Sequence, residues 1–307
     1  MRPRQPSSER GAALAIVLAS IVIVSLSIAG VIKLTKHQTE KGIFDASLHE
    51  ARLIAESGIA LGTHPDVTPI DEVLHQVMEP SGFQLDVKVV SEQGRILVNF
   101  ATDDFIAEGL EELFILWGVN PDDAAMAADS IADWVDTDRN ERTNGAENSW
   151  YAQAGYDEYP RNADFGSIEE LLLVRGMDEV VKVKPDWRNY FTLYGDGTID
   201  VNSAEADVIA AFTGVHEADA QRFVDTRNGP DGELGTPDDE LFSNETASDA
   251  TDLLNISTER AQELGARLTL EGSVIRVEST ATVANLRYTL SVIADRESGE
   301  QLARIGQ

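Results

Sequence analysis

Residues 10–33 of the chain read RGAALAIVLASIVIVSLSIAGVIK, with no charged side chain between Arg10 and Lys33. An α-helix rises about 1.5 Å per residue, so the uncharged run from Ala12 to Ile32 would extend roughly 32 Å. This length matches the hydrocarbon thickness of a bilayer, about 30 Å. A helix buried in a soluble protein would show a polar stripe, whereas this run has only scattered serines. We therefore expect residues 12–33 to form one membrane-spanning helix.

The segment before this helix, residues 1–11, is polar and carries three arginines. Lysines also follow the helix, so the positive-inside rule gives no clear orientation from charge alone. A short arginine-rich segment is poorly suited to translocation, which favours an amino end in the cytoplasm. A secretory signal would have a shorter apolar region, of about 7–15 residues, so cleavage after the run is the weaker interpretation.

The composition limits the classes of function open to the chain. Its 307 residues carry 54 acidic against 24 basic side chains, a formal charge of −30, and contain no cysteine. Such a surface repels phosphate backbones and anionic lipid headgroups, so we expect no nucleic-acid partner. Disulfides, thiolate metal sites and thiol nucleophiles are excluded. The acidity suits either a solvated surface or carboxylates that bind divalent cations.

The pattern beyond the membrane predicts an α+β fold. Helical spacing continues from residue 34 to 61, where glycines and a proline end it, and a further helix is expected at 70–78. Alternation at 83–90 and 95–100 predicts a β-hairpin. Strands are also expected at 267–270, 274–279 and 286–294, the last two joined by Ala284 and Asn285. The predicted divisions are a leader at 1–11, the membrane helix at 12–33, a long helix with the first strands at 34–101, an inserted helical domain at 102–265, and the returning strands at 266–307.

A weak repeat runs through the predicted insertion. An apolar residue is followed after four residues by a glycine, which gives Leu113 with Gly118, Leu171 with Gly176, and Ile209 with Gly214. Each unit reads as a short helix capped by a left-handed glycine. The third unit looks like a helix-hairpin-helix, a module that grips DNA phosphates elsewhere. Acidic neighbours make DNA contact improbable here, so a structural or protein-binding role is the preferred interpretation.

The junction of leader and apolar helix resembles the type III signal of pilins and pseudopilins. The resemblance implies cleavage by a prepilin peptidase after Gly11 and methylation of the new amino terminus at Ala12. The family's glutamate at the fifth mature position is replaced by Ile16. A carboxylate buried among such helices needs a cation, which in pilins is the amino terminus of the neighbouring subunit. A subunit at the tip has no such neighbour, and absence of the glutamate resembles the K-type minor pseudopilins.

A second resemblance covers the insertion. The stretch DWVDTD at 133–138, NGAE at 144–147, the tyrosines at 151, 156 and 159, and DVN at 200–202 follow the order of the K-type minor pseudopilin of type II secretion, also called general secretion pathway protein K. The resemblance implies a pilin-like helix and sheet with a large inserted helical domain. It also implies a tip subunit of the periplasmic pseudopilus, anchored in the bacterial inner membrane with its bulk in the periplasm, and other minor pseudopilins and the prepilin peptidase as partners. A minor pilin of a type IV pilus and a membrane-tethered DNA-binding protein of the competence type remain as alternatives.

Two acidic loops could bind a hard cation. Calcium takes six to eight oxygen ligands, and alternate loop positions can converge on one ion. Calcium binding is known in the K-type family, so the resemblance implies a calcium cofactor, although Glu141 stands where an EF-hand needs glycine. The candidate ligands are Asp136, Asp138, Asn140 and Glu147 in one loop, and Asp231, Glu233, Asp238 and Asp239 in the other.

We find no catalytic constellation in the sequence. The five histidines lack metal-binding spacing, and neither a GxSxG elbow nor a phosphate-binding GxxxxGK[ST] loop is present. We therefore expect that the chain is not an enzyme.

Overall fold

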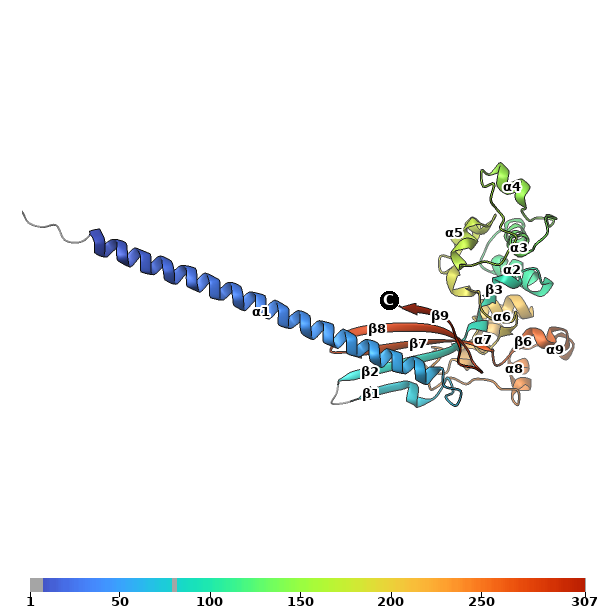
Figure 1. Ribbon diagram of the computed structural model, residues 1–307. Coiled ribbons are helices and arrows are strands. Elements are labelled where there is room, and N and C mark those ends of the chain that lie inside the picture. Colours follow the sequence, from blue (N-terminus) through green and yellow to red (C-terminus); the bar gives the residue numbers. More distant parts are fainter. Residues whose placement is uncertain (1–7, 79–81, 307) are drawn as a thin grey trace, which may run out of the picture.

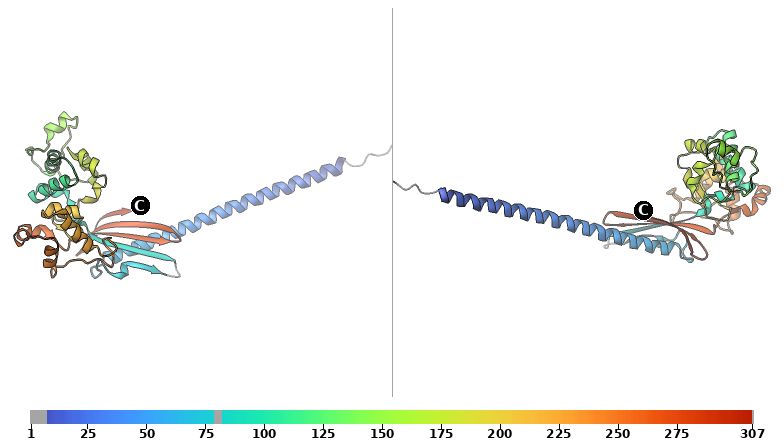
Figure 2. Two further views of the ribbon diagram at one scale, coloured as in Figure 1. Left: turned by 180° about the vertical axis from the view of Figure 1, so that it is seen from behind. Right: turned by 45° about the horizontal axis from the view of Figure 1, so that its top comes forward.

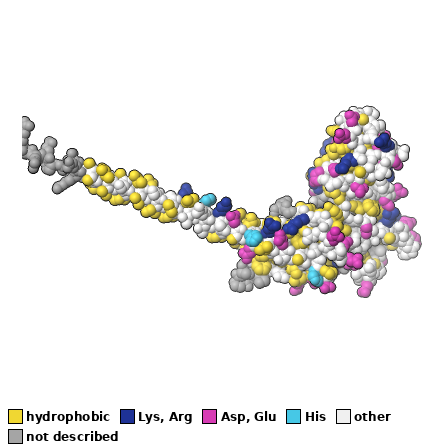
Figure 3. All heavy atoms as spheres, in the orientation of Figure 1, with side chains coloured by type: hydrophobic (Ala, Val, Ile, Leu, Met, Phe, Trp, Pro, Cys, Tyr) yellow, Lys and Arg dark blue, Asp and Glu magenta, His cyan; other side chains and the backbone are white. Residues whose placement is uncertain are grey.

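The computed structural model describes residues 8–78 and 82–306. Helix α1 (Ser8–Gly62) is continuous over 55 residues, and its first half projects away from the rest of the molecule (Figure 1). Within the described residues, one helix is long and apolar enough to cross a membrane. Apolar side chains cover this half of the helix, while acidic side chains are spread over the distal part of the chain (Figure 3). The helical pattern predicted for residues 12–61 is confirmed as one continuous helix, which ends at Gly62.

The main sheet contains five antiparallel strands in the order β1-β2-β7-β8-β9. Strands β7 and β8 are joined through Ala284 and Asn285, whose φ angles of 48° and 67° suit a two-residue type I′ turn. This connection is the one predicted from the sequence. The strands are β1 (His75–Met78), β2 (Phe83–Ser91), β7 (Val274–Val283), β8 (Leu286–Asp295) and β9 (Gln301–Gly306).

The second half of α1 covers one face of this sheet (Figure 2). Ala51 and Ala55 on the helix are fully buried, because their small side chains allow close approach to the strands. Val87 in β2 and Val277 in β7 point toward the helix from the centre of the sheet and are also fully buried. This layer forms one hydrophobic core of the protein.

Three local predictions were wrong. Residues 70–78 form a short 3₁₀ helix, η1 (Glu72–Leu74), and then strand β1, because pairing with β2 satisfies their backbone and, among residues 70–77, only Leu74 is buried. Residues 83–90 do form a strand, but its neighbours are β1 and β7, so the predicted hairpin with residues 95–100 does not exist. Residues 267–270 do not join the main sheet, and the edge strand β9 was not predicted, since its sequence QLARIG lacks clear alternation.

The chain leaves the main sheet at Ser91 and returns at Val274. The predicted domain limits of 102 and 265 lie inside this interval and remain a prediction. Two short parallel pairs flank the helices: β3 (Ile96–Leu97) with β4 (Phe191–Thr192), and β5 (Ile199–Asp200) with β6 (Leu268–Thr269). The α-helices between them are α2 (Asp104–Leu116), α3 (Pro121–Val135), α4 (Asn148–Gln153), α5 (Met177–Val183), α6 (Ala206–Thr213), α7 (Glu217–Arg227), α8 (Ala247–Leu253) and α9 (Thr258–Leu264).

We call residues 92–273 the inserted part. It lies at the end of the sheet opposite to the apolar half of α1 (Figures 1 and 2). Its hydrophobic core is separate from that of the sheet and is built around fully buried aromatic side chains such as Phe114, Trp134 and Trp187. The inserted part therefore has the packing of a unit in its own right.

The three repeat glycines all adopt positive φ, at 95° for Gly118, 86° for Gly176 and 75° for Gly214. Gly118 and Gly214 follow helices α2 and α6 as expected. Gly176 instead precedes α5, and the segment before it is a 3₁₀ helix, η4 (Ile168–Leu173). The helices α6 and α7 are joined by three residues and form a hairpin, but the repeats are not confirmed as helix-hairpin-helix units.

Candidate functional site

The loop between α3 and α4 brings three acidic side chains together. Asp136, Asp138 and Glu147 each offer one carboxylate oxygen, and these oxygens lie within 4.8 Å of one another. Two oxygens bound to one calcium ion at about 2.3–2.6 Å can lie at most about 5.2 Å apart, so the spacing suits a shared cation. Helix α3 ends immediately before Asp136, and Glu147 caps the start of α4, so both ends of the loop are held by helices.

Successive side-chain turns give the loop its shape. The Asp136 carboxylate accepts the backbone N–H of Asp138 at 3.2 Å, and the Asp138 carboxylate accepts the backbone N–H of Asn140 at 2.6 Å. The Asn162 side-chain amide donates to the carbonyl of Asp138 from across the loop. These turns hold the two aspartates at alternate positions, as their spacing predicted. Asn140 takes part through its backbone N–H.

Burial makes this cluster electrostatically costly when it is ionised. Glu147 is 3% exposed, and its Oε1 atom is buried without a hydrogen-bond partner. Burial raises the pKa of Glu147 to about 6, with smaller contributions in the same direction from the negative charges of Asp133, Asp136 and Asp138. The pKa of Asp136 is also raised, by burial and then by the charge of Asp138. A cation among these oxygens would remove both penalties, so the side chains present fit a bound divalent ion.

A fourth carboxylate, Asp133, supports the loop from inside the protein. It is fully buried and accepts the backbone N–H of Arg142 at 3.2 Å, while the Arg142 guanidinium lies 3.8 Å away. Burial raises the pKa of Asp133 to about 6. Sequence analysis did not identify Asp133 as a site residue. No local pattern marks it, because residues 130–135 are all buried and alternation along the helix does not set Asp133 apart.

The second acidic loop uses its carboxylates for internal bonds. Glu233 pairs with Lys88 of β2 at 2.6 Å, and Asp238 accepts the backbone N–H of Asp231 at 3.1 Å. Asp239 accepts the backbone N–H of Gly235 at 2.6 Å, although its other oxygen is buried without a partner. In the described part of the chain, the group of acidic oxygens close enough for one ion is that of the first loop. The structure thus brings together three residues of the first loop and does not bring together the four of the second.

The two predicted processing residues lie near the start of α1. Gly11 and Ala12 are exposed, and a side chain added at Gly11 would meet no atom within 4 Å. The glycine is therefore not required by packing within the chain, and cleavage after it stays a prediction.

The arrangement of these parts defines a class of protein. A long helix with an apolar first half packs its second half on an antiparallel sheet, and a helical part is inserted between two neighbouring strands of that sheet. This is an α+β, pilin-like fold with a large insertion.

Comparison with known proteins finds a match in sequence and a match in fold. Residues 85–184 match the family model described as "Type II secretion system (T2SS), protein K". The fold is similar to a chain in the crystal structure of the GspK-GspI-GspJ complex from the enterotoxigenic Escherichia coli type 2 secretion system. The TM-score is 0.60 at 15% identity, covering 88% of this chain and 99% of that chain. No curated protein sequence matches. The predicted resemblance to type II secretion protein K is confirmed.

Proposed function

We propose that this chain is a minor pseudopilin that occupies the tip of the type II secretion pseudopilus, where it initiates and caps the assembly that exports folded proteins. The family match over residues 85–184 supports type II secretion over a type IV pilus. The position of the inserted part carries the argument for the tip. It extends beyond the distal end of the sheet, where a further subunit would otherwise stack (Figure 1). A chain of this shape suits the end of a filament and not its repeating body.

The proposed partners are other minor pseudopilins. The matched crystal structure is a complex of GspK with GspI and GspJ, which supports equivalent partners for this chain. Co-purification of the tagged full-length chain from detergent-solubilised membranes should recover the I-type and J-type subunits. Recovery of type IV pilus subunits in their place would contradict the assignment.

The proposed anchoring is a single pass through the inner membrane with the amino end in the cytoplasm. Its support is the helix that is long and apolar enough to span a bilayer. Processing by a prepilin peptidase would leave Ala12 as the methylated amino terminus. Mass determination of the chain with and without co-expressed peptidase tests this step, since only cleavage after Gly11 gives the predicted mass.

We also propose that the first acidic loop binds calcium through Asp136, Asp138 and Glu147. The unpartnered Oε1 atom of Glu147 and the convergence of the three carboxylates support it. An ion bound only by the folded state stabilises it, by about 2.7 kcal/mol at a hundred times the dissociation constant. The melting temperature of the full chain in detergent should therefore rise by several degrees from EDTA to millimolar calcium. An unchanged melting temperature would refute calcium binding and leave the pseudopilin assignment standing.

The proposed role needs no catalytic activity. The matched family is a structural component of a secretion machine, and the acidic loop serves stability in this proposal. The strong negative charge opposes binding to DNA.

A further inference from the structure

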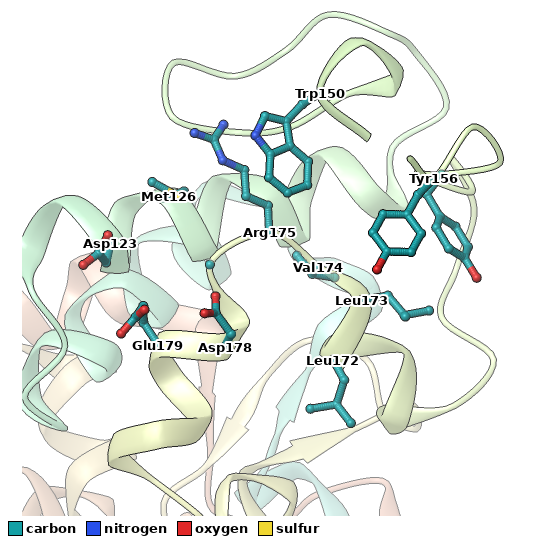
Figure 4. Close-up of a pocket in the computed structure, with 12 residues that line it drawn as sticks. Asp123, Met126, Trp150, Tyr156, Leu172, Leu173, Val174, Arg175, Asp178 and Glu179 are labelled. Atoms are coloured by element: carbon teal, nitrogen blue, oxygen red, sulfur yellow. The ribbon is translucent and has the colours of Figure 1, made fainter. Parts of the chain in front are cut away.

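The inserted part carries a groove that the tip role does not explain. It has a volume of about 470 Å³ and lies between α3, α4, α5 and η4 (Figure 4). This size is within the range of ligand pockets, about 300–1,000 Å³. Its wall combines aromatic, aliphatic and acidic side chains.

The groove gathers exposed apolar side chains that lie apart in sequence. The inserted part exposes five large apolar side chains, and three of them line this groove: Tyr156 at 55%, Leu172 at 47% and Leu173 at 41%. The other two, Phe100 at 44% and Val183 at 45%, lie outside it. A scattered exposed leucine needs no explanation, but convergence of several on one concave surface marks an interaction site.

Local geometry explains why these leucines face outward. The run from Leu171 to Val174 is entirely apolar, and most of it lies in the 3₁₀ helix η4. Side chains three residues apart in such a helix point the same way. Leu171 and Val174 are accordingly buried at 0% and 4% exposure, while the two leucines between them point into the groove. Nearly half of each of these two side chains is left exposed by the described part of the chain.

The two ends of the groove differ in chemistry. Tyr156, Leu172 and Leu173 lie at one end, and Asp123, Asp178 and Glu179 lie at the other (Figure 4). Asp123 has no ion pair among the described residues. Lys182 pairs with Asp178 at 3.2 Å and with Glu179 at 2.6 Å, but its side chain is 59% exposed. Exposed pairs of this kind contribute little and exchange readily for another cation.

The one arginine of the groove does not neutralise the acidic end. Its guanidinium lies 5.1 Å from the centre of the Trp150 ring and donates to the carbonyl of Gly145 at 2.8 Å. Arg175 is thereby held against Trp150 and forms no ion pair with Asp178 or Glu179 within the described residues (Figure 4). The acidic end therefore keeps a negative potential that selects for a cation.

We propose that this groove binds an extended segment of a partner protein, which places an aliphatic or aromatic side chain against Tyr156, Leu172 and Leu173. A lysine or arginine of the same segment lies at Asp123, Asp178 and Glu179. The apolar end supplies burial and the acidic end supplies charge selection. An anionic membrane surface does not fit, because the chain carries a formal charge of −30. The proposal concerns a surface remote from α1 and holds independently of the secretion system that the chain serves.

The test uses fluorescein-labelled peptides and the full-length chain in detergent, with fluorescence anisotropy as the readout. One set of glycine-serine peptides carries Phe and Lys zero to three residues apart, and a matched set carries Glu in place of Lys. We expect at least one Phe–Lys spacing to bind with a submillimolar dissociation constant, at least tenfold more tightly than its Phe–Glu counterpart. The double variant Leu172→Ser, Leu173→Ser should weaken this binding at least tenfold. Val183→Ser removes an equally exposed apolar side chain outside the groove and should leave it unchanged.

A second pair of variants, one in the groove and one outside it, tests the acidic end. Asp123→Asn should reduce the preference for lysine over glutamate several-fold, whereas Asp122→Asn, next to it but outside the groove, should not. Absence of binding by all Phe–Lys peptides at 1 mM would overturn the proposal. Equal binding of the lysine and glutamate sets, or equal effects of the groove and control variants, would overturn it as well. None of these outcomes depends on subunit co-purification, so failure here leaves the pseudopilin assignment intact.

Discussion

Arg276 of β7 binds Glu92 through two hydrogen bonds, from Nε to Oε2 and from Nη2 to Oε1, each 2.8 Å long. Glu92 is 1% exposed and also accepts the hydroxyl of Thr192 in β4 at 2.7 Å. Since Arg276 belongs to the sheet and Thr192 to the inserted part, this one carboxylate joins the two. The neighbouring Gln93 also joins the two parts, because it accepts the backbone N–H of Val274 in β7 and donates to the side chain of Asp196 in the inserted part.

The first prediction concerns this junction. Glu92→Gln keeps the size of the side chain but leaves the guanidinium of Arg276 without its anion, so the free energy of unfolding should fall by about 3 kcal/mol. Thermal melting of the detergent-solubilised chain measures the loss. Glu56→Gln is the matched control, because Glu56 forms an exposed pair with Arg304 at 3.0 Å and should show little change. Equal effects of the two substitutions would contradict a joining role for Glu92.

The second prediction concerns the contact of α1 with the sheet. A Cβ atom added at Gly58 would lie 2.1 Å from Ser279 Oγ and 2.8 Å from Val87 Cγ2, so the helix or the strands must move. Gly58→Ala should lower the free energy of unfolding by about 1–3 kcal/mol. Gly42 lies on the same helix with nothing within 4 Å of the added atom. Gly42→Ala should therefore raise stability slightly, by about 0.5–1 kcal/mol. A stabilising effect of Gly58→Ala would contradict the close packing of α1 at Gly58 against Ser279 and Val87.

The elements predicted correctly are those that depend on interactions between residues close together in the sequence. The apolar run after Gly11 has the length of a membrane span, and the pair Ala284-Asn285 between two alternating stretches leaves a two-residue turn as the simple solution. The elements missed depend on distant partners. Residues 95–100 alternate like a strand, yet the chain leaves the sheet after Ser91, where Glu92 binds Arg276, 184 residues away. No local pattern reveals such a pairing.

In the candidate site, too, the residues predicted correctly follow from local sequence, and those missed depend on distant contacts. Alternate oxygen-bearing residues identified Asp136 and Asp138, and Glu147 follows Asp136 by eleven residues, the spacing of the bidentate glutamate in an EF-hand. The supporting role of Asp133 depends on its burial in the tertiary fold. The sequence shows only an acidic residue near the end of a helix and does not reveal that it is buried. The second loop had equally suitable composition, but Lys88 of a distant strand takes up Glu233. Composition therefore indicates which carboxylates could bind a cation, but contacts between distant parts of the chain determine which of them are already paired.

The third prediction is a pH dependence in metal-free protein. Folding raises the pKa of Asp133 from an ordinary value of 3.8 to about 6, so the folded state favours the protonated form. Its contribution to stability is fully present below pH 3.8 and is lost as the pH rises through 6. In EDTA, the stability of the protein relative to Asp133→Asn should therefore fall between pH 4 and pH 7, by the order of 2 kcal/mol. Melting temperatures of both proteins across this range measure the difference. A difference that is constant with pH would show that Asp133 titrates normally.

The fourth prediction separates the two acidic loops. If calcium binds where Asp136, Asp138 and Glu147 converge, Asp138→Asn removes one anionic ligand and should abolish most of the rise in melting temperature between EDTA and millimolar calcium. Asp138 is exposed, so the metal-free stability of this variant should stay close to that of the original protein. Glu233→Gln is the matched control in the second loop, where the carboxylate already binds Lys88.

The control should lose some stability in EDTA, since an ion pair is broken, but should keep the full response to calcium. The opposite pattern, with the response lost in Glu233→Gln and kept in Asp138→Asn, would place the ion in the second loop. It would also require the second loop to rearrange on binding, because Glu233 must release Lys88 before it can reach a cation. Isothermal titration of calcium into both variants distinguishes these cases directly, since binding to the first loop predicts strongly reduced heat from Asp138→Asn and an unchanged isotherm from Glu233→Gln.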